Sequence, residues 1–344
     1  AAGNQSAVST NSTTLTVDTS APNAPGALAD TSIVSGYVNA ANDLAGQALT
    51  GTAEANSTVS VYNNGTLLGT TTANGSGAWS YTLGALAQGS YSLTAKSTDA
   101  AGNVGAASTA LAFTVDTAAP NAPTGLADAA KNAAGYVNSA IQTVTGSAEA
   151  NSTVTIYDTN GTTVVGTGVA NGSGAFSVTL SSLVDGAHTL TAKSTDAAGN
   201  VSTVSTGLTL TVDTVAPNAA TITSVTDGVS PITGALTNGA YTNDTSPVVK
   251  VSLSGTNAVS GNTIQLYNGS GTTSQLGSSY TLTSTDITNG YANVQPGTLS
   301  NGSTYTITAR ITDAAGNQSA VSTNSTTLTV DTVAPNAPGA LADA

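Results

Sequence analysis

The segments STVSVY (57–62), GAWSYTL (77–83) and YSLTAKS (91–97) decide the fold class of this chain. In each of them apolar and polar residues alternate, as they do in a strand with one face in a core and the other in water. Asn-Gly pairs at Asn64 and Asn74 stand between these runs, and Asn-Gly tolerates the positive φ of tight hairpin turns. No stretch shows a helical period, so we expect an all-β chain.

The pattern recurs because the sequence is a tandem repeat, and the period of a repeat indicates the architecture. The phrase VDTxAPNA occurs four times, and its aspartates are Asp18, Asp116, Asp213 and Asp331. The phrase TDAAGN occurs three times, at 98–103, 195–200 and 312–317. About seven strands in each repeat of roughly 97 residues are typical of an immunoglobulin-like sandwich. We therefore expect tandem Ig-like β-sandwich domains in an elongated rod.

The repeat phrases also predict the domain boundaries. We expect a terminal strand of a preceding repeat, three complete domains of which the third is longer, and a linker that opens a following repeat. The respective ranges are 1–18, 19–116, 117–213, 214–331 and 332–344. Residues 1–19 are identical to 314–332, and residues 21–30 to 334–343, so the three domains together look like one unit of a larger repeat and the natural protein is expected to be longer.

Composition excludes several kinds of function. The 344 residues include no Cys and one His, which removes thiolate nucleophiles, disulfides, zinc–sulfur sites and His-based triads. Five Lys and Arg against 18 Asp and Glu give a net charge of -13, and such an acidic chain repels nucleic acid. No run of 18 apolar residues is present, so we expect no membrane insertion. These features favour a chain that is not an enzyme.

Alternation also predicts which side chains form the cores. In the first two domains the inward residues are Val59, Val61, Trp79, Tyr81, Leu83, Leu93 and Phe113, with Val154, Ile156, Phe176, Leu180 and Leu190 as counterparts. We read Trp79 as a core residue rather than a surface for sugar stacking, and His188 as an exposed strand residue. The prolines of the linkers fix φ and bias the preceding residue to extended geometry, which predicts semi-stiff joints.

Sparse acidic residues recur at the ends of predicted strands that share one pole of an Ig-like sandwich with the incoming linker. The expected clusters are Asp18, Glu54 and Asp99 where the linker enters the first domain, Asp116, Glu149 and Asp196 where it enters the second, and Asp213 and Asp313 where it enters the third, with Asn257 offered there as a neutral substitute. Converging carboxylates repel one another unless a cation lies between them. Ca²⁺ accepts six to eight oxygen ligands in loose geometry, so the sequence predicts interdomain calcium sites.

A simpler reading explains the same aspartates without a metal. The Asp of TDAAGN can close a turn through its own backbone, the Asp of VDT can start the linker turn, and Glu54 can be a solvated loop residue. Asp30, Asp128, Asp227 and Asp343 recur shortly after each linker. They could join the calcium site or cap a strand edge, and the sequence favours neither role.

Four phrases together carry a family resemblance: GTAEA (51–55), NGSGAW (74–79), TDAAGN (98–103) and VDTxAP in the linkers. They resemble the Ig-like repeats of giant type I-secreted bacterial adhesins, such as the biofilm-associated proteins of Gram-negative bacteria. The resemblance covers essentially the whole chain. It implies an extracellular stalk at the bacterial cell surface that holds an adhesive region away from the cell, in a family where many members bind calcium between domains.

The expected function is therefore structural: a stalk segment that supports cell adhesion and biofilm formation, with calcium-stiffened joints. Its expected partners are neighbouring repeats of the same chain, with other adhesin copies or matrix polymers as further candidates. The alternatives are a module that binds glycans or host surfaces, an accessory repeat of a secreted polysaccharide-degrading enzyme, and a self-associating fibre in which 1–18 supplies an unpaired strand.

Overall fold

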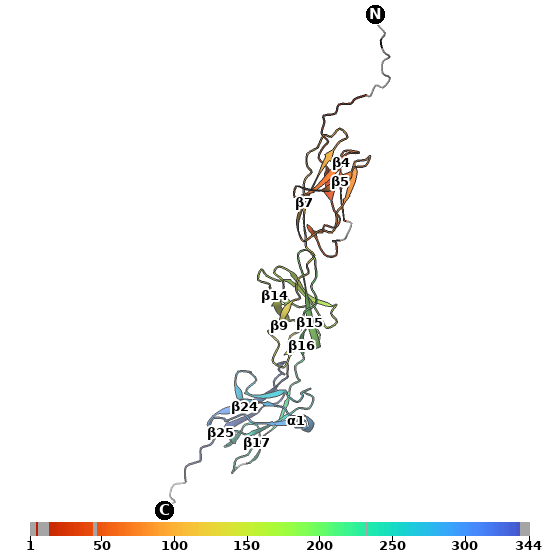
Figure 1. Cartoon of the computed structure of the whole chain (residues 1–344). Helices are drawn as coiled ribbons and strands as arrows, with labels where there is room; N and C mark the ends of the chain where they lie inside the picture. The colour runs from red at the N-terminus through yellow and green to blue at the C-terminus, as the bar shows by residue number, and fades with distance from the viewer. Residues whose placement is uncertain (1–4, 6–13, 44–46, 232, 338–344) are drawn as a thin grey trace, which may run out of the picture.

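The structure is a computed structural model that describes residues 5, 14–43, 47–231 and 233–337. These residues form three β-domains that follow one another along an elongated chain (Figure 1). Domain 1 holds β1 to β8, domain 2 holds β9 to β16, and domain 3 holds β17 to β25. No helix in the described ranges has the length and apolar character needed to cross a membrane.

Domain 1 is a sandwich of a three-stranded sheet, in the order β1-β3-β6, and a five-stranded sheet, in the order β2-β8-β7-β4-β5. Its strands are β1 (Gly26–Ala29), β2 (Tyr37–Val38), β3 (Ala48–Thr52), β4 (Thr58–Asn63), β5 (Thr66–Thr72), β6 (Ala78–Thr82), β7 (Gly89–Thr98) and β8 (Leu111–Val115). The hairpin between β4 and β5 turns at Asn64 and Gly65, whose φ values of 48° and 82° belong to the left-handed region that Asn-Gly adopts at little cost.

Domain 2 repeats this topology, with sheets β14-β11-β9 and β10-β16-β15-β12-β13. Its strands are β9 (Thr124–Asp128), β10 (Tyr136–Val137), β11 (Thr143–Ser147), β12 (Thr153–Tyr157), β13 (Val164–Val169), β14 (Ala175–Thr179), β15 (Gly186–Thr195) and β16 (Leu208–Val212). In both domains a short second strand pairs in parallel with the last one, β2 with β8 and β10 with β16. This pairing places the residue after the second strand beside the linker that leaves the domain.

Domain 3 is the longer unit, with sheets β18-β17-β20-β23 and β19-β25-β24-β21-β22. Its elements are β17 (Thr221–Asp227), β18 (Gly234–Leu236), β19 (Ala240–Thr242), β20 (Val248–Ser252), β21 (Thr263–Asn268), β22 (Gln275–Thr281), α1 (Ser284–Asn289), β23 (Tyr291–Val294), β24 (Thr304–Thr312) and β25 (Thr326–Val330). The expectation of no helix was wrong at α1, where Thr283 and Asp286 form a capping box.

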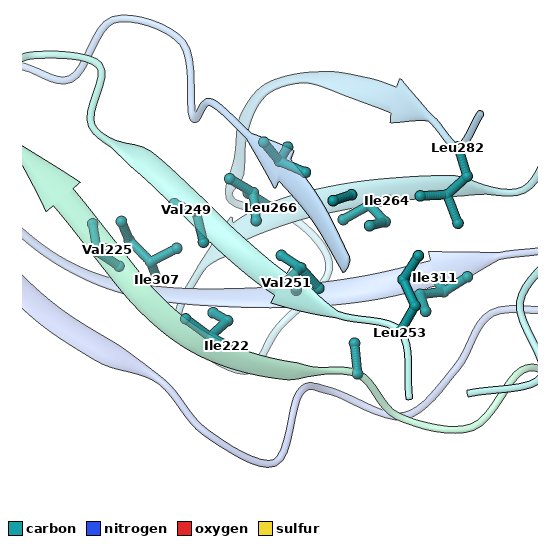
Figure 2. Packing of buried hydrophobic residues seen from close by; sticks show 14 of the residues in the cluster. Ile222, Val225, Val249, Val251, Leu253, Ile264, Leu266, Leu282, Ile307 and Ile311 are labelled. Carbon is teal, nitrogen blue, oxygen red and sulfur yellow. The ribbon is translucent and has the colours of Figure 1, made fainter. Parts of the chain in front are cut away.

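Each domain has its own hydrophobic core between its two sheets. In domain 3, Val225 of β17 and Val249 of β20 face Ile307 of β24 and Leu266 of β21 across the sandwich (Figure 2). Every core residue predicted for domains 1 and 2 is buried except Tyr81, which is half-buried. The all-β sandwich prediction is confirmed.

The predicted terminal strand 1–18 lies largely outside the described residues. Its described part, 14–18, has no strand assignment, and the side chains of Leu15 and Val17 are exposed.

Candidate functional site at the joints between domains

The turn of sequence DAAGN forms the incoming pole of each domain, and its asparagine binds the linker. In domain 2, Asn200 donates from Nδ2 to the carbonyl of Asp116, at 2.8 Å, and to Oδ2 of Asp196, at 2.9 Å. Its backbone N–H donates to Oδ1 of Asp196 at 2.9 Å. The turn can close in this way because Gly199 adopts a φ of 90°, which a residue with a side chain rarely reaches.

The same arrangement recurs in domains 1 and 3. Asn103 donates to the Asp18 carbonyl at 3.1 Å. Asn317 donates to the Asp213 carbonyl at 2.8 Å. Each of these asparagines also donates to the aspartate that opens its own turn, Asp99 or Asp313. The linker is therefore fixed to the domain that follows it by one amide–carbonyl bond at every DAAGN turn.

Two further contacts cross from domain 1 to domain 2 at joint 1, the contact region of these two domains. Asn39, directly after β2, donates from Nδ2 to the carbonyl of Ala198 at 2.9 Å. The backbone N–H of Ala40 donates to Oδ1 of Asn200 at 3.0 Å. The amide of Asn200 thus contacts its own turn, the linker and the preceding domain at once. Asn200 is only 6% exposed, so these contacts are buried in the interface. Hydrogen bonds in such surroundings are costly to leave unmade.

Joint 2, between domains 2 and 3, has a related contact. Asn132 of domain 2 donates from Nδ2 to the carbonyl of Ala314 at 2.8 Å. The third residue of the turn is buried at both joints, as Ala198 and Ala315, whereas the corresponding Ala101 of domain 1 is exposed. Burial of this alanine thus accompanies contact with a preceding domain.

Among the predicted ligands, the aspartate of each linker and the aspartate of the DAAGN turn that follows it bind the same asparagine side chain. The linker aspartates do not take part through their carboxylates, as a calcium site would require. The carboxylates of Asp18, Asp116 and Asp213 each accept the backbone N–H two residues on, as the alternative reading of a local linker turn expected. Their carbonyls, not their carboxylates, bind the asparagine of the turn. In the DAAGN turns of domains 1, 2 and 3, both carboxylate oxygens of Asp99, Asp196 and Asp313 accept from that asparagine. The hydrogen bonds from Asn103 lower the pKa of Asp99, and they outweigh the desolvation that would raise it.

The predicted glutamates lie apart from these aspartate pairs. Glu54 lines a groove of about 330 Å³ with Asn23 and Thr52. Glu149 lines an equivalent groove in domain 2, also of about 330 Å³. In domain 3 Val259 takes the position of Glu54, because Asn262 N donates to its carbonyl as Ser57 N donates to that of Glu54. Asn257 therefore does not occupy the glutamate position. Within the described ranges no three His, Cys, Asp or Glu side chains form a group that could hold a metal ion.

Asp30 and Asp128 form a second recurring feature, at the outgoing poles of domains 1 and 2. Each is 8% exposed, and Oδ2 of each is buried with no hydrogen-bond partner among the described residues. The counterpart in domain 3, Asp227, has its Oδ2 bound by the hydroxyl of Thr242 at 2.7 Å. Domains 1 and 2 carry Val38 and Val137 at that position, which cannot donate. A buried carboxylate oxygen without a donor is unfavourable unless a cation or water binds it.

His188 of domain 2 is buried, at 6% exposed, so the expectation of an exposed residue was wrong. Its Nδ1 lies 2.9 Å from Oδ1 of Asp158, and its Nε2 lies 2.8 Å from the Val184 carbonyl. Since both ring nitrogens face acceptors, both bonds are satisfied only by the protonated ring. Burial lowers the pKa of His188, but the bonds to Val184 and Asp158 outweigh it and raise the pKa above 6.5. The pKa of Asp158 is lowered below 3.8 because the bonds from His188 and Thr159 outweigh desolvation.

This pair predicts a pH dependence of the stability of domain 2. Because folding raises the pKa of His188, its protonated ring stabilises the fold. This stabilisation is complete below pH 6.5 and is lost as pH rises through the pKa of the folded state. The lowered pKa of Asp158 stabilises it above pH 3.8, and this is lost as pH falls through the folded pKa. We expect the calorimetric midpoint of domain 2 to be highest between these two values.

The matched variant for that measurement is His188→Tyr. Domain 1 has Tyr91 on the corresponding strand, and its hydroxyl donates to the Ala87 carbonyl as His188 Nε2 does to Val184. Lys131 lines a groove together with His188, but its Nζ donates to the Thr209 carbonyl rather than to the His188–Asp158 pair. An equal fall of the domain 2 midpoint above pH 6.5 in both proteins would show that His188 does not cause it.

Comparison with known proteins identifies the family of domains 1 and 2. Residues 35–117 match the bacterial Ig-like domain family, and residues 119–212 match the bacterial Ig domain family. Domains 1 and 2 are bacterial Ig-like domains. Both are therefore of the type that the sequence phrases indicated.

Two curated relatives contain related sequence. Chitinase A1 of Niallia circulans is 36% identical over 200 residues, which cover 55% of this chain and 26% of that protein. Exoglucanase B of Cellulomonas fimi is 33% identical over 244 residues, which cover 67% of this chain and 19% of that protein. The chain thus spans about a quarter or less of their lengths, and the matched parts are their Ig-like regions.

Solved structures that match this chain include an adhesin and a domain of a biofilm-associated protein. One, described as a Ca²⁺-stabilized adhesin that helps an Antarctic bacterium reach out and bind ice, has a TM-score of 0.39 and 24% identity, with 91% of this chain and 75% of that chain covered. Another, the BSP domain of a biofilm-associated protein, has a TM-score of 0.21 and 16% identity, with 93% and 69% covered.

Proposed function

We propose that this chain is a stalk segment of a bacterial surface adhesin, in which bacterial Ig-like domains are held in line to carry an adhesive region away from the cell and support biofilm formation. The observation that carries the proposal is the joint: Asn200 contacts its own turn, the linker and the preceding domain in one buried position. A string of domains that touch only their neighbours extends without folding back, provided that each joint resists bending. Tandem repeats with fixed joints are the architecture that such a stalk requires.

We further propose that Ca²⁺ stiffens joints 1 and 2. The orphaned Oδ2 atoms of Asp30 and Asp128 support this, since each is a buried anionic oxygen without a donor. Asp116 and Asp213, in the linkers that leave these two domains, are the second carboxylates that we assign to the two sites. Because no third acidic side chain joins either pair in the described ranges, most of the six to eight ligands would be carbonyls and water. Such a site binds weakly, on the order of 10⁻⁴–10⁻³ M.

Small-angle scattering and calorimetry in millimolar Ca²⁺ and in chelator test this proposal. With calcium we expect a longer maximum dimension and higher melting midpoints for domains 1 and 2. Asp30→Asn and Asp128→Asn should each abolish the response of their own domain. Asp227→Asn is the matched control, because Thr242 already binds that carboxylate, and it should leave the calcium response unchanged. An identical scattering profile and identical midpoints with and without calcium would exclude a stiffening role for the ion.

A second candidate function follows from the two curated relatives, since Ig-like regions of a chitinase and an exoglucanase match this chain. In that case the chain would be an accessory segment of a secreted polysaccharide-degrading enzyme. Sedimentation with insoluble chitin or cellulose separates the two proposals. A stalk segment stays in the supernatant, whereas an accessory segment that holds the polysaccharide sediments with it.

A further inference from the structure

We propose that the outgoing pole of domain 3 is a docking site for the DAAGN turn of a further Ig-like domain, one with the sequence of residues 19–116 joined in the same chain. This inference rests on the proposed stalk function, and it names the partner that would form a joint with the outgoing end of domain 3.

The docking site is the pocket of about 470 Å³ between domain 3 and its outgoing linker. Its walls come from the end of β17, from β19 and the residue after it, and from the linker, and the residues that matter here are Asp227, Tyr241, Asn243, Asp331 and Val333. The side chains of Tyr241 and Val333 are 71% and 69% exposed. Tyr37 and Tyr136, the counterparts of Tyr241, are half-buried. The pole of domain 3 therefore leaves exposed an aromatic residue that the other two domains partly cover.

The pocket matches the part of joint 1 that domain 1 supplies. Tyr241 pairs with Thr329 in the parallel β19–β25 ladder as Tyr37 pairs with Thr114 between β2 and β8. Asn243 then follows β19 as Asn39 follows β2. In joint 1 the amide of Asn39 reaches the turn of the next domain, at the carbonyl of Ala198. In domain 3 the amide of Asn243 turns back to the carbonyl of Ser230, at 2.9 Å.

The incoming half of the same joint is found at the other end of the structure. Asn103 of domain 1 donates to the carbonyl of Asp18, and the VDT linker sequence around Asp18 is repeated around Asp331. Residues 334–343 continue as residues 21–30 do. A domain with the domain 1 sequence placed after Asp331 would thus offer its turn asparagine to the carbonyl of Asp331, a residue that lines the pocket. Ala101 in that turn is exposed here, as expected for a turn with no preceding domain against it among the described residues.

The chemistry of the two surfaces is complementary. The turn brings small apolar side chains, Ala100 and Ala101, and an amide that donates. The pocket offers the exposed ring of Tyr241 to the alanines and carbonyl and carboxylate oxygens to the amide. The partner is thus an alanine-rich turn with one free-standing donor amide, and its single charged side chain, Asp99, is already bound by Asn103 within the turn.

The test is an extended chain in which residues 31–116 follow Asp343. Because the chain has no cysteine, one cysteine can be placed in each of two domains, spin labels attached, and the distance distribution measured. We expect a narrow distribution between domain 3 and the added domain, like that across joint 1. Tyr241→Ser combined with Asn243→Ala should abolish the narrow peak at the new joint only. Asn289→Ala, at the end of α1 and outside the pocket, is the control and should leave it unchanged.

The outcomes separate this inference from the proposed function. A broad distribution at the new joint, with narrow distributions across joints 1 and 2, would overturn the docking site and leave the stalk proposal intact. Broad distributions at all joints would overturn both. Calorimetry of the pocket variants checks that domain 3 remains folded, and a narrow peak that persists in folded Tyr241→Ser/Asn243→Ala protein also counts against the docking site.

Discussion

Replacing Trp79 by alanine is expected to lower the stability of domain 1 by about 3–5 kcal/mol, the usual cost of removing a large aromatic side chain from a core. Trp79 on β6 is 4% exposed and pairs with Gly51 on the neighbouring strand β3. A Cβ added at Gly51 would lie 2.6 Å from the indole ring, so the ring fills the space that a side chain there would occupy. Its Nε1 is buried without a partner among the described residues, so the loss is one of packing rather than of a hydrogen bond.

Calorimetry distinguishes the domains in this experiment. Only the transition of domain 1 should move, because the three cores are separate clusters. Ser80→Ala is the matched control on the outward face of the same strand, and its loss should be within about 0.5 kcal/mol. As the single tryptophan, Trp79 also reports the unfolding of domain 1 by fluorescence in the parent chain. A fall of all three transitions together would contradict independent cores.

Replacing Asn200 by alanine is expected to loosen joint 1 and to lower the stability of domain 2 by about 1–3 kcal/mol, the cost of leaving buried polar groups unpaired. The variant removes the donor to the Asp116 and Asp196 oxygens and the acceptor for Ala40 N. Spin labels in domains 1 and 2 should then give a broad distance distribution in place of a narrow one.

Two further variants separate the effect of Asn200→Ala on joint 1 from its effect on the stability of domain 2. Asn103→Ala removes the equivalent bonds to Asp18 and Asp99 in domain 1 but no bond from the loop of a preceding domain, so it should leave joint 1 unchanged. Asn39→Ala removes the bond to Ala198 across the joint, together with the bonds that its Oδ1 accepts from Ala41 N and Asn42 N inside domain 1. It removes no bond within domain 2, so it should broaden the distribution without changing the midpoint of domain 2. If Asn200→Ala and Asn103→Ala broaden joint 1 equally, the amide of Asn200 is not what orients the domains.

Several structural features missed by the sequence interpretation were nevertheless encoded locally. His188 shares its strand face with Leu190 and Ala192, so the alternation of β15 already placed it inward. Its ionic partner, Asp158, lies thirty residues away and is not visible in that alternation. The helix α1 is preceded by Thr283 as its N-cap, with Asp286 three positions later, a capping signal that spans too few residues to appear as a helical period.

The sequence by itself determined the repeat, the sandwich and the face that each strand buries, because alternation along a strand is a local property that backbone geometry converts directly into burial. It also placed the aspartates of the linker and of the turn at one pole. Only the tertiary structure decided that the linker aspartate binds through its carbonyl while its carboxylate closes a turn two residues long. The carboxylate of Asp116 accepts from a backbone N–H only two residues away. The donor to its carbonyl, Asn200, lies 84 residues away in the sequence and is brought beside it only by the fold of the whole domain.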